Sequence, residues 1–301
     1  MVDIDCLSSV GVGTYRMSID YDIHFQALKT AVENGYNLID TATNYCNGTS
    51  EELIGKFIDV YPSYADKLFI ISKVGYLPSI KSRTTNFLQF LEEKKPAIAE
   101  IDTDFEYSSD LNFIAYQLEQ SLKKVGRDYL DVYLLHNPER LLQSKKLNQS
   151  SDLHAAISKA FTFLEQQVKE GKIRYYGVSS NTIIDPHQTG SINCQELLDI
   201  ATSIQTNHHF KFIQATFDED STTIEPLFQA TKQQTYLHAL NNQTNKTQLF
   251  LEQLKQENIP IKENTVLTAC NAYLHHFKLD HVLVGLRTPT YVHALNQTFT
   301  S

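Results

Sequence analysis

The sequence predicts an α/β protein built as a (β/α)8, or TIM, barrel of eight parallel strands. Short apolar runs typical of buried strands alternate with segments of helical periodicity, which is the rhythm of a parallel sheet. Three of these runs end in a charged or titratable residue, at Asp40, Lys73 and His136. The carboxyl ends of barrel strands meet at one mouth, where sites lie. The length of 301 residues fits one such barrel, so residues 1–301 are interpreted as a single domain.

The first third of the chain gives strand, helix, strand, helix and strand. A strand in SSVGVGTYRM leads into a Gly-rich turn, and the apolar spacing from Phe25 to Val32 predicts a helix that ends at Gly35. A strand ends at Asp40, and Ser50 is the expected N-cap of a helix that runs to about Val60. The next strand ends at Lys73. Only ten residues precede the first strand, which leaves little room for a lid over the base of the barrel.

The same rhythm continues after an interruption. Residues 76–110 have no clear periodicity and predict a long loop with one short helix at about 86–93, and such loops usually cover sites or bind partners. The strands expected after it are the run to His136, IRYYGVSS, FKFIQATF, TYLHALNN and HVLVGLRTP, with IPIKEN as an alternative seventh strand. The helices expected between them lie at about 114–125, 157–168, 196–203, 222–233, 248–256 and 265–277.

Composition and charge exclude several classes of function. A net charge of -9 without a basic cluster argues against nucleic acid or an anionic membrane surface as a partner. The apolar runs are shorter than a membrane span, and the acidic N-terminus is unlike a signal peptide, so a cytoplasmic protein is expected. The four cysteines are widely spaced without metal-ligand spacing, which predicts reduced thiols and no metal site.

Four residue types at one rim predict proton-transfer chemistry. A buried Asp40 requires a cation, and Lys73 is the expected partner. The ammonium would lower the pKa of the Tyr45 phenol, which is near 10 in water, so that Tyr45 protonates an oxygen as hydride reaches the adjacent carbon. The His136 imidazole would fix the direction of a carbonyl. A structural role remains open for each residue. Asp40 and Lys73 could form an ion pair at the rim, His136 could be a polar strand cap, and Tyr45 could be simply one of the 16 tyrosines.

At these positions the chain resembles the aldo-keto reductase superfamily. The matching segments are VGVGTYRM, GYNLIDTATNYCNGTSEELIGK, FIISK, SLKKVGRDYLDVYLLHNPE, GKIRYYGVSS and VLVGLRTPTYV, and the LLHNPE form resembles a bacterial-type branch. The resemblance implies a metal-free reductase that uses NADPH. It also implies that Asp40, Tyr45, Lys73 and His136 form the catalytic tetrad, with Tyr45 as the acid/base.

The resemblance also assigns cofactor contacts. It places the nicotinamide ribose beside the first strand, the carboxamide at Ser179 and Gln214, and the 2′-phosphate of NADPH at Arg287 and Thr288, which favours NADPH over NADH. Ser180 stands where many members have Asn. The implied cofactor-binding residues are Gly13, Thr14, Tyr15, Asp40, Ser179, Ser180, Gln214, Arg287 and Thr288.

The chain departs from the family where the nucleotide is held. Leu237 aligns with the aromatic residue that stacks on the nicotinamide, and only Asn296 of the segment 294–296 could contact adenine. The expected function is an NADPH-dependent reductase of a small aldehyde, ketone or sugar. The alternatives are an aldose dehydrogenase working in the oxidative direction, a non-catalytic binding or regulatory protein with a weakened cofactor site and, less favoured, a metal-dependent barrel enzyme.

Overall fold

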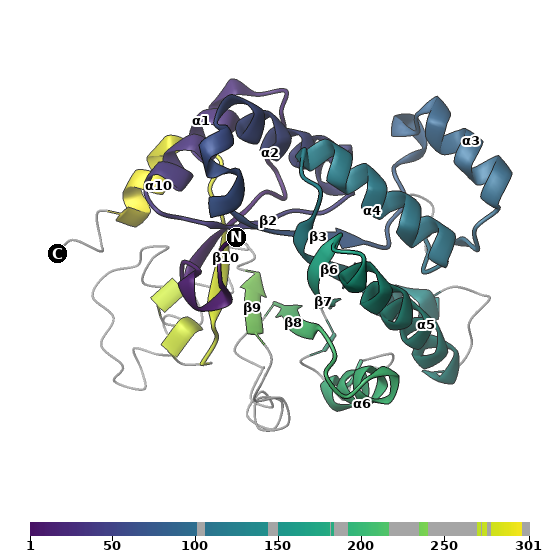
Figure 1. Cartoon of the computed structure of the whole chain (residues 1–301). Coiled ribbons are helices and arrows are strands. Elements are labelled where there is room, and N and C mark those ends of the chain that lie inside the picture. The colour runs from purple at the N-terminus through teal and green to yellow at the C-terminus, as the bar shows by residue number, and fades with distance from the viewer. Residues whose placement is uncertain are drawn as a thin grey trace.

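Eight parallel strands close into a barrel in the computed structural model, in the order β1-β10-β9-β8-β7-β6-β3-β2 (Figure 1). The structure describes residues 1–100, 106–143, 150–180, 182–183, 192–216, 235–239, 270–271, 273–275 and 278–296. The barrel strands are β1 (Val10–Gly13), β2 (Leu38–Asp40), β3 (Phe69–Val74), β6 (Leu130–His136), β7 (Ile173–Ser179), β8 (Phe210–Ala215), β9 (Thr235–Ala239) and β10 (His281–Gly285). The predicted (β/α)8 barrel is confirmed, and TYLHALNN supplies its seventh strand.

Helices cover the outside of the barrel. They are α1 (Asp22–Glu33), α2 (Thr49–Val60), α3 (Thr85–Lys94), α4 (Leu111–Val125), α5 (Ser150–Lys169), α6 (Cys194–Ile204) and α10 (Pro289–Asn296). The ends of α4 follow from its local sequence. The Asp110 carboxylate caps the first turn, and Gly126 ends the helix in the left-handed conformation (φ 71°). The helices expected at 222–233 and 248–256 lie outside the described residues, and that at 265–277 is described only at 270–271 and 273–275, which are helical.

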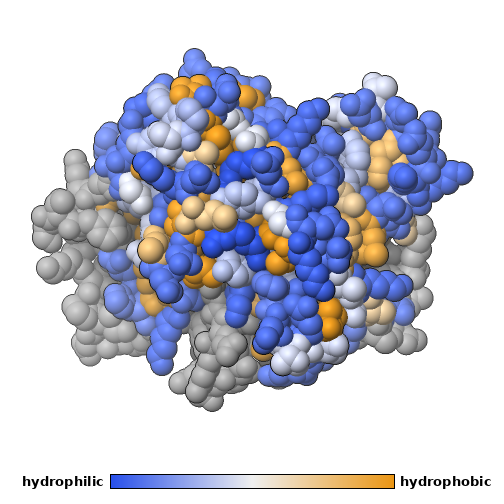
Figure 2. Space-filling view, viewed as in Figure 1, coloured by the Kyte–Doolittle hydropathy of each residue, from blue (hydrophilic) through white to orange (hydrophobic). Residues whose placement is uncertain are grey.

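The surface is mostly hydrophilic on the face seen in Figure 2, where hydrophobic side chains form small separate groups. Within the part of the chain that the structure describes, no helix has the length and apolar content needed to cross a bilayer.

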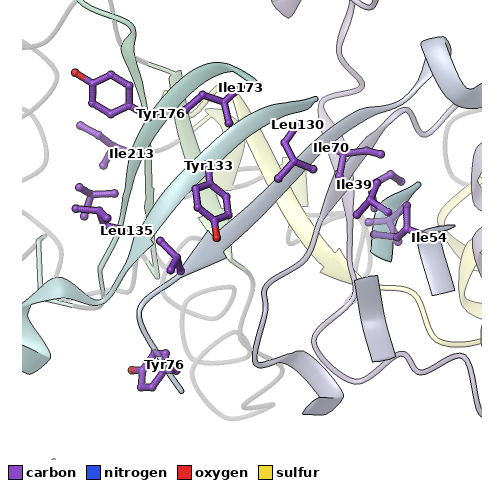
Figure 3. Close-up of a cluster of buried hydrophobic side chains, with 14 of the residues drawn as sticks. Ile39, Ile54, Ile70, Tyr76, Leu130, Tyr133, Leu135, Ile173, Tyr176 and Ile213 are labelled. Carbon is purple, nitrogen blue, oxygen red and sulfur yellow. The ribbon is translucent and has the colours of Figure 1, made fainter. Parts of the chain in front are cut away.

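Two hydrophobic layers follow from the alternation of side chains along the strands. Outward-facing residues such as Ile39, Ile70 and Tyr133 pack between the barrel and the helices, where Ile54 of α2 lies beside Ile39 (Figure 3). Inward-facing residues fill the barrel itself: Leu38, Phe69, Ile71, Val132, Leu134, Phe212, Leu237 and Leu283. The barrel is therefore a packed core, as in other barrels of this class.

The candidate site residues occupy the next inward position along the same strands. Two residues beyond Leu38, Ile71, Leu134 and Phe212 come Asp40, Lys73, His136 and Gln214, respectively. A strand repeats its facing every second residue, so these four side chains share the interior side with the apolar layer below them. The strand pattern thus places a polar layer at the carboxyl-end mouth of the barrel.

The N-terminal segment closes the opposite end, which corrects the expectation of little room for a lid. Val2, Ile4 and Leu7, around the single turn η1 (Ile4–Cys6), pack against the apolar interior. Arg174 donates to the Val2 carbonyl oxygen (2.6 Å) and to the buried carboxylate of Asp131 (2.8 Å). One turn of chain is enough because three apolar side chains cover a barrel whose interior is already filled.

The long loop after β3 contains a hairpin that the sequence did not predict. The expected helix is present as α3, and it is followed by the antiparallel pair β4 (Ala99–Glu100) and β5 (Glu106–Tyr107). Strands of two residues are too short to show an alternating pattern. β5 attaches to the segment that leaves β3, because Leu77 N donates to the Glu106 carbonyl oxygen (2.9 Å) and Ser108 N to that of Gly75 (2.9 Å). The hairpin is thereby fixed beside the carboxyl end of β3.

Candidate active site

A fully buried lysine joins the predicted acid and phenol. Lys73 Nζ lies 2.7 Å from Asp40 Oδ1, donates to Tyr45 Oη (3.0 Å) and to the Thr41 carbonyl oxygen (2.8 Å). These three acceptors match the three protons of an ammonium. Because the phenol oxygen accepts from Lys73, its own proton is directed elsewhere and can be donated to a bound oxygen.

Tyr45 is placed by the turn between β2 and α2. It opens the short helix η2 (Tyr45–Gly48), in which Cys46 and Asn47 adopt left-handed conformations (φ 46° and 57°). Ser50 is not the N-cap of α2, as the sequence suggested, because the helix already begins at Thr49. Its hydroxyl instead donates to the carbonyl oxygens of Thr14 (3.0 Å) and Met17 (2.5 Å). The loop after β1 is thereby tied to the helix that follows Tyr45.

Burial decides the protonation of the phenol. The pKa of Tyr45 is raised well above its ordinary value, first by burial and then by the charge of Asp40. The expectation that Lys73 lowers the pKa of Tyr45 is therefore wrong. The hydration free energy that a phenolate loses on burial is larger than the stabilisation it gains from one neighbouring ammonium. Burial also raises the pKa of Asp40 and lowers that of Lys73, and the 2.7 Å pair opposes both shifts. Tyr45 consequently holds its proton at neutral pH, as a proton donor requires.

His136 lies across from Tyr45 at the end of β6. The ring centroids are 5.9 Å apart and the planes meet at 79°. Burial, together with the positive charges of Lys73 and Arg140, lowers the pKa of His136 well below its ordinary range. A neutral imidazole is therefore present at physiological pH, and it can hydrogen-bond a carbonyl oxygen without adding a charge to the site. The structure brings all four predicted catalytic residues together.

The residues expected to hold the nicotinamide surround this group. The backbone N–H of Thr14 and its hydroxyl both donate to the Asp40 carbonyl oxygen (2.9 and 3.0 Å), which ties the end of β1 to β2. Gly13 lies beside Asp40 in the barrel register. The Tyr15 side chain is exposed, and its ring meets that of Tyr45 edge-on at 5.1 Å. These three residues form the rim next to the phenol.

Gln214 and the two serines form the opposite part of the rim. Gln214 Nε2 donates to Asp40 Oδ1 (3.0 Å) across the barrel, and Ser179 pairs with Gln214 in the register of β7 and β8. Gln214 Oε1 is buried and, among the described residues, has no hydrogen-bond partner. A buried acceptor of this kind suits the N–H group of a carboxamide. The Ser180 N–H donates to the Gln214 carbonyl oxygen (2.9 Å), so its backbone supports the same strand end.

Arg287 and Thr288 follow β10, whose Gly285 pairs with Gly13 of β1. They therefore lie on the same rim, and Thr288 Oγ1 accepts from Tyr291 N (3.4 Å) at the start of α10. An arginine at a helix N-terminus is suited to a phosphate. Leu237 is fully buried among the apolar side chains of the barrel interior. The side chain of Asn296 and the loop after β9 lie outside the described residues.

Sequence reasoning missed Tyr76 and Asn137. The Tyr76 ring lies 5.0 Å from that of His136, and Asn137 Nδ2 donates to Tyr76 Oη (3.0 Å). The position of Asn137 directly after His136 was the available signal. In the described part of the chain, the cysteines are free thiols and no group of three or more His, Cys, Asp or Glu side chains could hold a metal ion.

Comparison with known proteins identifies related sequences. A model of the aldo/keto reductase family matches residues 9–216. A D-threo-aldose 1-dehydrogenase from a Pseudomonas species is 27% identical over 180 residues, 57% of this chain and 48% of the relative. The protein tas of Escherichia coli (strain K12) is 32% identical over 190 residues, 58% of this chain and 49% of the relative. The matched segment thus spans about half the length of these relatives.

A solved structure shows the same fold over most of the chain. An aldo-keto reductase from Bacillus halodurans in its holo form superposes with a TM-score of 0.67 at 19% identity, covering 98% of this chain and 87% of that one. The family match covers both strands of the buried ion pair, the Tyr45 turn and the strand of His136. The chain therefore belongs to the aldo/keto reductase family, whose members are NAD(P)-dependent oxidoreductases.

Proposed function

We propose that this protein is an NADPH-dependent reductase of small carbonyl compounds. The observation that carries the proposal is the lysine-centred group, in which Lys73 Nζ contacts Asp40 at 2.7 Å and Tyr45 Oη at 3.0 Å, with a neutral His136 next to the Tyr45 ring. A protonated phenol next to a buried cation can donate its proton to the oxygen of a bound substrate. Nothing else on the described rim offers a comparable acid.

The residues of the chain have separate tasks in this reaction. The nicotinamide cofactor, when bound, would supply a hydride to the carbonyl carbon. His136 hydrogen-bonds the carbonyl oxygen and fixes its direction, while Tyr45 gives its proton to that oxygen as the charge develops. Lys73 stabilises the phenolate that remains, and Asp40 holds the ammonium in place. Solvent then returns the proton to Tyr45, and the product is the alcohol.

The cofactor assignment is supported from two sides of the rim. Gln214 Oε1 offers a buried acceptor for the carboxamide, and Arg287 offers a cation at the start of α10 for the 2′-phosphate. The substrate class, a small aldehyde, ketone or sugar, is supported by family membership. A relative named as an aldose 1-dehydrogenase keeps sugar oxidation open as the physiological direction.

Nucleotide binding provides the direct test. Titration of the full chain with NADPH, followed by tyrosine fluorescence or calorimetry, is expected to show saturable binding that is tighter than for NADH. Arg287→Ala should weaken NADPH binding about tenfold or more, because a charged hydrogen bond contributes ~1.5–3 kcal/mol, and should leave NADH binding unchanged. Lys29→Ala removes a partly exposed cation paired with Glu33 and serves as the matched control. Failure of both nucleotides to bind would contradict the proposal and favour a non-catalytic binding protein.

The two directions of the reaction should depend on pH in opposite ways. Reduction needs a protonated Tyr45, whose pKa is raised, so its rate should stay constant from neutral to alkaline pH. Alcohol oxidation needs the phenolate, whose fraction rises about tenfold per pH unit below the pKa. Its rate should therefore climb steadily with pH. Steady-state profiles in both directions, with D-glyceraldehyde and glycerol as probes, measure this; a reduction rate that falls steeply above neutral pH would contradict the raised pKa.

A further inference from the structure

Tyr76 lies beside the imidazole of His136. Their ring centroids are 5.0 Å apart at an interplanar angle of 83°, an edge-to-face geometry that aromatic pairs favour. Tyr45 also meets the same imidazole edge-on, at 5.9 Å and 79°. Contact with the two phenol rings limits rotation of the imidazole about its Cβ–Cγ bond. The pair therefore restricts the ring that is proposed to direct the substrate.

The hydroxyl of Tyr76 is fixed by the residue that follows His136. Asn137 Nδ2 donates to Tyr76 Oη at 3.0 Å. Asn137 has φ 51°, a left-handed conformation that asparagine tolerates better than most residues. Its backbone N–H donates to the Ser179 carbonyl oxygen (2.6 Å), which anchors the turn to the end of β7. The direction of the Asn137 amide, and with it the position of Tyr76, is set by the barrel itself.

The ring of Tyr76 is fixed from the other side by the β4–β5 hairpin. Tyr107 of β5 meets Tyr76 edge-on at 5.5 Å and 81°, and the two residues form a β-bridge. The Tyr107 ring lies against the backbone of Gly75, where a Cβ would collide with it. Tyr76 and Tyr107 are both buried. A side chain held at its hydroxyl, its ring and its backbone keeps a single position.

We propose that Tyr76 is a positioning residue: held by Asn137 and Tyr107, it sets the plane of the His136 imidazole and thereby the direction in which a substrate carbonyl is bound. The inference rests on the proposed reductase function for its catalytic consequence. The orientation of His136 itself is a property of the protein without substrate, so it can be measured separately.

The first experiment observes His136 directly. Long-range 1H–15N spectra of histidine-labelled full-length protein, with the His136 signals assigned by their loss in His136→Gln, report the tautomer and titration of the ring. The wild type is expected to show one neutral tautomer that resists protonation below pH ~6.5, the ordinary pKa of histidine. Tyr76→Leu should give mixed tautomers and a titration that moves back toward that value. Tyr76→Phe, which retains the ring, should lie between the two.

Two further variants complete the design. Asn137→Gly removes the amide donor while glycine tolerates the positive φ, and it should reproduce the effect of Tyr76→Phe. Tyr133→Phe changes a buried phenol on the outer face of the same strand as His136 and should leave the spectrum unchanged. If Tyr76→Leu fails to fold, Tyr76→Phe and Asn137→Gly carry the test. His136 signals identical to wild type in these variants would overturn the proposal.

Turnover separates this inference from the function on which it rests. With NADPH and 4-nitrobenzaldehyde, Tyr76→Leu should lower kcat by about 10- to 100-fold. A displacement of a reacting group by about 1 Å can reduce the rate by up to about 100-fold. NADPH affinity should be unchanged. An inactive wild type with altered His136 signals in the variants would overturn the reductase function and support the positioning role. An active wild type with unaltered signals and kcat in the variants would overturn the positioning role alone.

Discussion

Replacing Tyr45 with phenylalanine is expected to abolish most of the carbonyl reduction while leaving the fold and NADPH binding intact. The substitution removes only the hydroxyl that accepts from Lys73 at 3.0 Å. General acid catalysis by a positioned side chain contributes about 10²–10⁴-fold, so kcat should fall by that factor. The phenylalanine ring retains the edge contacts with Tyr15 and His136. The loss should therefore appear in kcat rather than in the affinity for the nucleotide.

The measurement is single-turnover oxidation of NADPH in the presence of excess aldehyde. Tyr21→Phe is the matched control, because it removes a hydroxyl from an exposed tyrosine away from the tetrad. Equal turnover in the wild type and in Tyr45→Phe would eliminate Tyr45 as the acid and, with it, the proposed mechanism.

Replacing Lys73 with methionine should affect both stability and activity. The methionine fills similar space but leaves Asp40, which is 4% exposed, without its cation. Breaking a buried ion pair by removing one partner costs about 3–5 kcal/mol, so the free energy of unfolding should fall by that order. The phenolate of Tyr45 would also lose its stabilising charge, and kcat should drop as strongly as in Tyr45→Phe.

A double variant separates the two consequences. Asp40→Asn combined with Lys73→Met removes both charges, and an asparagine can still accept from Gln214 Nε2. Most of the lost stability should return, and activity should not.

In the single variant Lys73→Met, the pKa of Asp40 is raised by burial, so the folded state binds a proton more readily than the unfolded state. The stability deficit should therefore be largest at neutral pH and shrink as the pH falls, as denaturant unfolding at several pH values can show. A deficit that grows on acidification would contradict this account of the ion pair.

The buried pair of Asp40 and Lys73 was predictable because strand periodicity and the free-energy cost of burying a charge both indicate it. Asp40 and Lys73 each end an apolar strand, and each requires an opposite charge once buried. Their strands are neighbours in the barrel, so pairing follows from topology. The arrangement around His136 was not predictable, because Tyr76 and Tyr107 meet through a hairpin whose strands are two residues long. No periodic signal exists at that length.

The direction of the Tyr45 pKa shift could not be predicted from the sequence either. A nearby lysine could be inferred from the chain, but the depth at which the phenol is buried could not. Burial is the largest cause of the shift, and it depends on tertiary packing around the ring, which includes Tyr15 and His136. The packing of Val2, Ile4 and Leu7 against the base of the barrel was also not predicted. A single helical turn has too few residues for its sequence to indicate where it packs.

The hydrogen bond between Gln214 and Asp40 joins positions 174 residues apart. The acid lies on the second barrel strand in chain order, whereas its amide partner arrives on the sixth, so the polar layer is incomplete until most of the chain has been made and the ring of strands has formed. Helices and neighbouring strand pairs can assemble from local segments, but this contact cannot. Recovery of enzymatic turnover during refolding would therefore mark a late, global event, and far-ultraviolet circular dichroism would report the earlier local ones.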